Sequence, residues 1–163
     1  MLIRSGLAIG VVATCMLSGP THAQVQSQKD VTWNLGLEIA QGAIAECAKR
    51  NVPISVAVVD RAGRLRIFIA ADNPSPHSLE LARRKAYTAR TFRIPSGEMV
   101  TRLKNDPSLG LIHLSNVIAN QGALPIKVGD ETIGAVGASG APGGEKDEAC
   151  VKAGIEKVAD QLK

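Results

Sequence analysis

The residues best suited to ligand chemistry lie near the end of the chain, where a glycine-rich segment leads into a helix. Residues 133–137 are typical of an apolar strand, residues 138–144 (ASGAPGG) of a loop, and residues 145–150 of a helix start. Glycine lets a ligand approach bare backbone amides, and the positive end of a helix dipole attracts anionic groups. The ligand-binding positions expected at this edge are Gly137, Ser139, Gly140, Gly143 and Gly144.

The spacing of these glycines does not match a phosphate-binding loop of a nucleotide-binding protein. A P-loop ends in Lys-Ser or Lys-Thr, and a dinucleotide-binding fingerprint opens the first βαβ unit of its domain. Neither feature accompanies residues 138–144. The sequence therefore gives little support to nucleotide binding.

Three segments taken together resemble one known family. They are residues 56–64 (VAVVDRAGR), residues 82–89 (ARRKAYTA) and the glycine-rich loop at residues 138–144. With these segments the chain resembles the GlcG/HbpS-like family, which includes the C-terminal domain of PduO-type proteins. The resemblance covers nearly all of the chain after residue 23. It implies a small α/β domain with profilin-like layers, self-assembly into homo-oligomers and, in several members, haem binding.

A helix predicted at residues 78–92 carries basic side chains that could meet an acidic ligand. Arg83 and Arg90 are seven residues apart and therefore share one face of this helix. One interpretation is a solvated basic face. The other is that one or both guanidinium groups bind carboxylates, either haem propionates or a small organic acid. The resemblance implies that Lys85 and Thr88 line or support the same site.

Two histidines follow residue 23, and each has a structural alternative to iron binding. His77 directly precedes the helix at residues 78–92, where it could cap the helix or face solvent. It is also the candidate ligand for haem iron, since neutral imidazole is the commonest nitrogen ligand. His113 lies among apolar residues and is expected to pack, or to be oriented by one hydrogen bond, in preference to acting as a ligand. No CxxCH motif is present, so any haem is expected to be non-covalent and held at a subunit interface.

A complete catalytic constellation is missing from the sequence. It contains no Ser-His-Asp order, HExxH motif, paired-carboxylate cleft or Walker motif, so no catalytic residue is assigned. Asp60, at the end of a predicted buried strand, is expected to be a turn-forming acceptor and not a base. Asp147 and Glu148 are expected to stabilise a helix start and cap its amides. The sequence favours a binding protein over an enzyme.

Residues 1–23 have the three parts of a secretory signal peptide. A positive residue precedes an apolar core at residues 7–17, and a small-residue cleavage site precedes Gln24. Cys15 opens a lipoprotein alternative, but the residue before it suits lipid attachment poorly. We therefore predict a periplasmic or secreted protein with one domain at residues 24–163. No stretch of that domain is long and apolar enough to span a bilayer.

Charge and aromatic content argue against a nucleic-acid partner. After residue 23 the chain carries 18 Lys and Arg against 15 Asp and Glu, a net charge of +3. Aromatic side chains for base stacking are scarce, with one Trp, one Tyr and two Phe in the whole chain. Nucleic-acid binding usually combines a stronger basic surface with stacking platforms.

Cys47 and Cys150 are the two cysteines that follow the signal peptide. An even number of cysteines in an oxidising compartment favours a disulfide between them, and each lies on a predicted helix. The alternative is a pair of buried apolar thiols. Metal ligation is disfavoured because neither cysteine has a CxxC partner or a close histidine.

Hydrophobic periodicity predicts the elements that must position these residues. Thr32 and Ser96 are expected N-caps of the first and third helices. Helices are predicted at residues 32–50, 78–92, 96–105 and 145–162, and strands at 54–59, 64–70, 124–128 and 132–138, with 109–120 ambiguous. Strands linked mainly as hairpins indicate an α+β class. The predicted fold is a profilin-like layered domain with a five-stranded antiparallel sheet and packed helices.

Three functions are compatible with these observations. The first is an exported, oligomeric protein that binds haem non-covalently for storage, sensing or delivery, as the resemblance implies. The second is an enzyme or accessory factor for a small carboxylate, in keeping with the family's association with glycolate-type metabolism. The third is a structural assembly module that binds neither ligand.

Overall fold

The computed structural model describes residues 25–163, and the predicted signal peptide lies outside them. Ten elements follow in the order α1 (Trp33–Ala48), β1 (Ser55–Val59), β2 (Leu65–Ala70), α2 (Ser78–Phe92), α3 (Ser96–Asn105), η1 (Gly110–His113), β3 (Ala123–Val128), β4 (Glu131–Ser139), α4 (Gly144–Glu156) and η2 (Ala159–Gln161). Among the described helices, none is long and apolar enough to cross a membrane.

The sheet has the strand order β2-β1-β4-β3, with antiparallel pairing between all neighbours. Within residues 25–163 it has four strands, so the predicted α+β class is confirmed and the predicted count of five is wrong. The ambiguous segment forms η1 and a loop instead of a strand. Its backbone bonds are local, because the amide of Leu114 donates to Leu111 and that of Val117 donates to Leu114.

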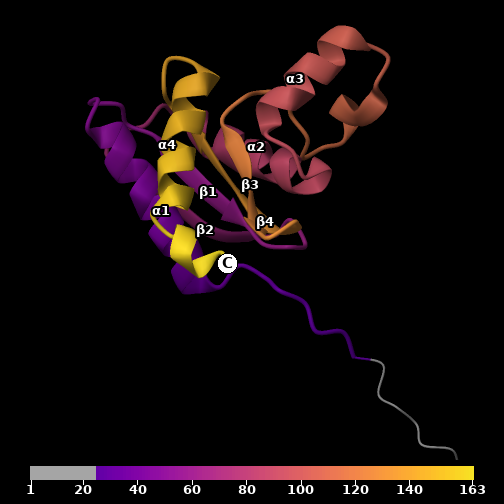
Figure 1. Cartoon of the computed structure of the whole chain (residues 1–163). Coiled ribbons are helices and arrows are strands. Elements are labelled where there is room, and N and C mark those ends of the chain that lie inside the picture. Colours follow the sequence, from indigo (N-terminus) through magenta and orange to yellow (C-terminus); the bar gives the residue numbers. More distant parts are fainter. Residues whose placement is uncertain (1–24) are drawn as a thin grey trace, which may run out of the picture.

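Two helical layers enclose this sheet (Figure 1). On one face, α1 and α4 pack side by side over a core that includes Ile39, Val58 and Val151. On the other face, α2 covers β1, β4 and β3 with small side chains such as Ala86 and Ala89. The strand β2 forms one edge of the sheet and extends beyond α2.

The expected caps of the first and third helices have different outcomes. Thr32 caps α1 as predicted, since its hydroxyl accepts a hydrogen bond of 3.2 Å from the amide of Leu35. The N-cap of α3 is Pro95 and not Ser96. The hydroxyl of Ser96 is buried and instead accepts a hydrogen bond of 3.0 Å from the amide of Ala123. The buried serine therefore connects α3 to β3 and does not cap the helix.

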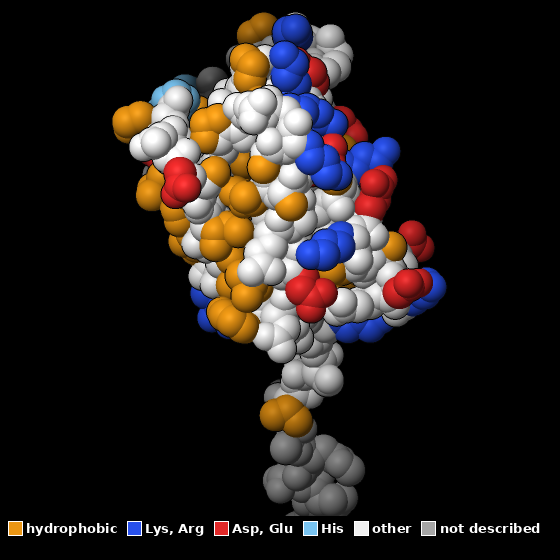
Figure 2. Space-filling view, turned by 90° about the vertical axis from the view of Figure 1, so that its left-hand side faces the viewer, with side chains coloured by type: hydrophobic (Ala, Val, Ile, Leu, Met, Phe, Trp, Pro, Cys, Tyr) orange, Lys and Arg blue, Asp and Glu red, His pale blue; other side chains and the backbone are white. Residues whose placement is uncertain are grey.

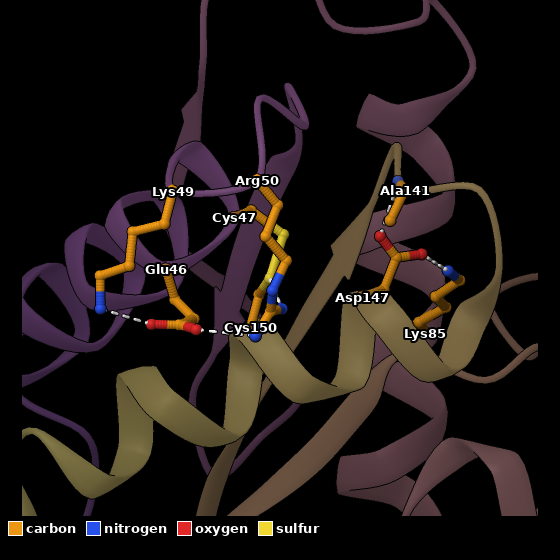
Figure 3. The surroundings of a disulfide bond; sticks show 8 residues. All are labelled: Glu46, Cys47, Lys49, Arg50, Lys85, Ala141, Asp147 and Cys150. Atoms are coloured by element: carbon orange, nitrogen blue, oxygen red, sulfur yellow. Dashed lines mark hydrogen bonds and ion pairs between the residues drawn. A yellow bond between two sulfur atoms is a disulfide. The ribbon is translucent and has the colours of Figure 1, made fainter.

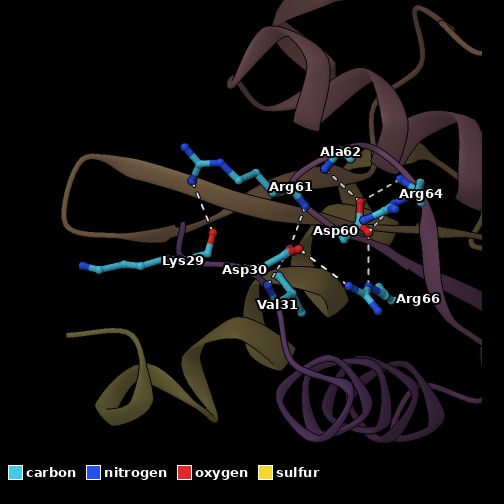
Figure 4. Close-up of polar contacts among 8 residues, drawn as sticks. All are labelled: Lys29, Asp30, Val31, Asp60, Arg61, Ala62, Arg64 and Arg66. Carbon is cyan, nitrogen blue, oxygen red and sulfur yellow. Dashed lines mark hydrogen bonds and ion pairs between the residues drawn. The ribbon is translucent and has the colours of Figure 1, made fainter. Parts of the chain in front are cut away.

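Asp60 shapes the turn between β1 and β2, as predicted (Figure 4). One of its oxygens accepts hydrogen bonds of 2.8 and 2.9 Å from the amides of Ala62 and Arg64. The other lies 2.9 Å from Nε of Arg64 and 3.2 Å from Nε of Arg66. Burial alone would raise the pKa of Asp60, but these donors outweigh it and lower the pKa. The turn is therefore built around a buried carboxylate anion.

The expected disulfide between Cys47 and Cys150 is present and joins α1 to α4 (Figure 3). The Cα atoms of the two residues lie 5.6 Å apart. Both cysteines are buried in the core between the helices and the sheet. The bond therefore connects the first and last helices of the layer.

Removing this disulfide should lower the free energy of unfolding, because it joins residues 103 positions apart. In the chain-entropy model a loop of this size contributes about 4 to 5 kcal/mol. Denaturant unfolding of the oxidised protein and of the Cys47→Ser/Cys150→Ser variant measures the difference. Reductant should destabilise the oxidised protein and leave the variant unchanged. Equal unfolding free energies of the two proteins would contradict the prediction.

Candidate functional site

A pocket of about 420 Å³ lies where the glycine-rich edge meets the start of α2. Six of the residues expected at a ligand site line it together: His77, Lys85, Ser139, Gly140, Gly143 and Gly144. Five further lining residues were not expected there: Ser75, Leu81, Asn120, Ala141 and Asp147. The pocket therefore joins α2, the end of β4 and the first turn of α4.

A buried ion pair between Lys85 and Asp147 forms the inner wall of this pocket (Figure 3). The side chains are 2% and 3% exposed, and Nζ lies 2.8 Å from Oδ2. Nζ also donates a hydrogen bond of 3.0 Å to the carbonyl oxygen of Ala138 at the end of β4. Oδ1 of Asp147 accepts a hydrogen bond of 3.0 Å from the amide of Ala141. Both charged groups are therefore partnered on more than one side.

Burial raises the pKa of Asp147, and the hydrogen bond and charge of Lys85 offset this effect in part. A buried carboxylate beside a buried ammonium leaves the inner wall with little net charge. The wall therefore holds the loop in place more than it attracts an anion.

The glycine-rich edge presents backbone amides at the start of α4, and the carboxylate of Glu145 lies beside Gly143 there. Gly140 and Gly143 have φ angles of 135° and 125°, which side chains rarely allow. These conformations turn the loop into the first turn of α4. No hydrogen bond within residues 25–163 satisfies the amides of Gly144 and Glu145. Amides at a helix N-terminus, supported by the helix dipole, suit a carboxylate or another anion.

His77 occupies the N-cap position of α2 at the rim of the pocket. Its imidazole is exposed and makes no capping hydrogen bond, which matches the solvent-facing alternative. His113 lies on η1 and is exposed, so the expectation that it packs is wrong. Its apolar neighbours belong to a surface loop and not to a core strand. Throughout the described part of the chain, no three His, Cys, Asp or Glu side chains are grouped to hold a metal ion.

Two of the expected site residues on α2 support a neighbouring loop outside the pocket. Nη1 of Arg83 donates a hydrogen bond of 2.9 Å to Oδ1 of Asn116. The hydroxyl of Thr88 is buried and accepts a hydrogen bond of 2.9 Å from the amide of Ile118. Both side chains therefore hold the segment between η1 and β3 against α2.

Arg90 and Gly137 also lie outside this pocket. Arg90 follows His77 by 13 residues, a distance of about 20 Å along a helix, and it lines a different pocket. Gly137 lies beneath α2, where a Cβ atom would approach the carbonyl oxygen of Ala82 at 2.6 Å and the amide of Ala86 at 2.7 Å. Its place is explained by the close packing of α2 on β4.

The sequence predicted only one of the two roles of Asp147. Its acceptance of the Ala141 amide fits the expected support of a helix start, but its ion pair with Lys85 was not foreseen. Glu148 was expected to share the capping role, yet its Oε2 is buried without a hydrogen-bond partner in residues 25–163. The sequence did contain an indication of this ion pair, because Lys85 falls on the buried stripe of Ala82, Ala86 and Ala89. A lysine on such a stripe requires a buried partner.

Comparisons with known proteins all lead to one family. The family model described as haem degrading protein HbpS-like matches residues 31–156. A crystal structure of HbpS has a TM-score of 0.79 and 28% identity, covering 85% of this chain and 96% of that one. A PduOC–haem complex has a TM-score of 0.72 and 21% identity, covering 78% and 94%. An uncharacterised 15.0 kDa protein of the dhaT-dhaS intergenic region of Citrobacter freundii is 30% identical over 113 residues, 68% of this chain and 80% of that protein.

Breaking the buried ion pair from either side should destabilise the protein. Lys85→Met leaves the carboxylate of Asp147 without its counter-charge, and Asp147→Asn does the same to the ammonium group. Each single change is expected to cost about 3 to 5 kcal/mol of unfolding free energy. The double variant buries no charge and should cost clearly less than the sum. Denaturant unfolding of the four proteins gives the coupling energy.

An exposed ion pair in the same helix provides the matched control. Lys152 and Glu156 lie 3.7 Å apart with exposed side chains. Lys152→Met is expected to change the unfolding free energy by about 1 kcal/mol or less. Additive costs for Lys85 and Asp147 would contradict the proposed coupling.

Proposed function

Because the chain belongs to the HbpS-like family, we propose that it binds haem without a covalent bond in the pocket between His77 and the glycine-rich edge. The observation that carries this proposal is that His77, whose imidazole makes no capping hydrogen bond, lines the same pocket as Gly143 and Gly144 at the start of α4. Imidazole can ligate haem iron, and helix N-terminal amides can bind a propionate. The pocket therefore offers one group for the iron and another for a propionate.

The other pocket residues support this arrangement without contacting iron. Lys85 and Asp147 neutralise each other, so we assign them to positioning the loop and α4. Bound haem would supply a redox-active iron. We infer binding for storage, sensing or delivery in preference to turnover, because the buried titratable groups at the pocket are committed to one another.

We also infer that the protein is exported. The signal sequence at residues 1–23 supports this inference, although it lies outside the described residues. The disulfide between Cys47 and Cys150 supports it as well, since such bonds persist in oxidising compartments.

Self-association is the third part of the proposal, and β2 offers the surface for it. Leu65 pairs with Val59 and Phe68 pairs with Ala57, on the face of the sheet that α2 covers elsewhere. Because α2 does not extend over β2, Leu65 is 47% exposed and Phe68 is partly exposed. Figure 2 shows hydrophobic side chains gathered along one side of the molecule. A second copy would cover such a surface and could complete a shallow haem site.

A small carboxylate is the alternative ligand, because the amides at the start of α4 suit a carboxylate group. A volume of about 420 Å³ suits a small acid held by the amides of α4. In that case the protein would act as an enzyme or accessory factor on such an acid.

Haemin titration tests the first proposal. The protein should develop a Soret band, and His77→Ala should shift that band and weaken haemin binding. A loss of about tenfold or more is expected, since even the partners of metal ligands change affinity by about 10- to 100-fold. His113→Ala is the control and should bind like the unchanged protein. Circular dichroism should show that both variants keep the fold.

Two results would overturn parts of this proposal. An unchanged spectrum and affinity in His77→Ala would remove His77 as the iron ligand. Absence of haemin binding by the unchanged protein would place the small carboxylate first.

Sedimentation tests the proposed self-association at micromolar concentration. The unchanged protein should sediment as an oligomer, and Leu65→Asp should shift it toward the monomer by placing a charge in the apolar contact. Leu114→Asp is the control, since Leu114 is 50% exposed on a different segment. A monomeric unchanged protein, or equal oligomers in both variants, would contradict the assignment of β2 to the interface.

A further inference from the structure

A second pocket, of about 320 Å³, lies between the segment before α1, the β1–β2 turn and the end of α2. It shares no lining residue with the proposed haem pocket. Arg61, Arg64 and Arg90 line it, and Asp30 is its acidic lining residue. Three guanidinium groups therefore face one carboxylate around this space.

The carboxylates near this pocket already have partners (Figure 4). Oδ1 of Asp30 accepts hydrogen bonds of 2.8 Å from the amides of Val31 and Arg61. Oδ2 of Asp30 lies 3.6 Å from Arg66. Asp60 is occupied by the turn amides and by Arg64 and Arg66, as described above. Asp60 is engaged at both oxygens, whereas Oδ2 of Asp30 has, among residues 25–163, only the 3.6 Å contact with Arg66.

Two of the three lining arginines are also partnered. Arg61 forms an ion pair with Glu131 through Nη1, which also donates a hydrogen bond of 3.3 Å to the carbonyl oxygen of Lys29. Arg64 donates from Nε to Asp60. Both guanidinium groups still have N–H groups beyond these bonds.

Arg90 differs from the other two. Its Nε is buried and has no hydrogen-bond partner among residues 25–163, and no ion pair reaches its guanidinium from them. Burial lowers the pKa of Arg90, and the nearby charges of Arg93 and Arg61 lower it further. Asp30 and Asp60 oppose this effect. An arginine nevertheless stays charged in proteins, so Arg90 remains a cation that Asp30 and Asp60 influence without forming an ion pair with it.

We propose that this second pocket binds a small oxyanion, either a phosphate or a carboxylate group, with Arg90 as its principal partner. A guanidinium group presents paired N–H donors that match two oxygens of such a group. Arg61 and Arg64, which also line the pocket, add positive charge. The proposal rests on residues outside the haem site and is independent of haem binding.

Anion titrations of the full-length exported protein test this proposal, with sodium chloride keeping the ionic strength constant. Inorganic phosphate and malonate are titrated separately by calorimetry. The Nε–H resonance of Arg90, identified by its loss in Arg90→Lys, is followed by NMR in the unchanged protein. At least one anion should bind with a stoichiometry of one per chain and shift this resonance. Binding of phosphate alone, malonate alone or both supports the site and identifies the class of anion that it takes.

Substitution of Arg90 completes the test. Arg90→Gln should weaken anion binding by about tenfold or more, as expected for losing hydrogen bonds from a charged group. It should leave haemin binding unchanged, which separates this site from the haem pocket. Arg102→Gln is the control, because Arg102 is exposed on α3. The proposal is overturned if neither anion binds, if the Arg90 resonance does not move at saturation, or if Arg90→Gln binds as before.

Discussion

The buried ion pair between Lys85 and Asp147 is the interaction on which the pocket beside His77 and the glycine-rich edge depends. Two charges removed from water cost several kcal/mol each unless both are fully partnered. Here Nζ contacts the carboxylate and a carbonyl of β4, while the carboxylate also accepts a loop amide. The space around the pair is equally restricted, because a Cβ atom at Gly122 would lie 2.9 Å from Nζ and 2.8 Å from Cβ of Asp147. Moving any one of these segments would leave a buried charge without its partner.

The helix α4, which carries Asp147, makes a second attachment about one turn later, at Cys150. Asp147 connects α4 to α2, and Cys150 connects it to α1. Further along, Gly154 lets α4 approach α1 so closely that a Cβ atom there would lie 2.4 Å from the carbonyl oxygen of Ile39. The first turn of α4, which contributes Gly144 and Asp147 to the pocket, is therefore anchored to both helical layers. The site is formed by three elements that cannot shift independently.

Periodicity and cap chemistry predicted most of the fold, including α1 with its Thr32 cap and the turn around Asp60. The secondary structure of residues 109–120 could not be assigned from the sequence, because the backbone amides of its apolar residues form hydrogen bonds within local turns. Within the site, the small-residue stripe of α2 could have indicated that Lys85 is buried, but not that Asp147, 62 residues later, meets it. Arg90 shares a face with Arg83, yet the rise of the helix carries it to another pocket.

The disulfide closes residues 47–150 into a covalent ring that includes the exposed loop at residues 72–77 and the segment around η1. A single proteolytic cut in either segment would open this ring without separating the two pieces of chain. The elements on both sides of the cut would stay at high effective concentration and could keep their noncovalent contacts. Such a nick would add only the mass of one water molecule to the oxidised protein, and the two pieces of chain would separate only after reduction.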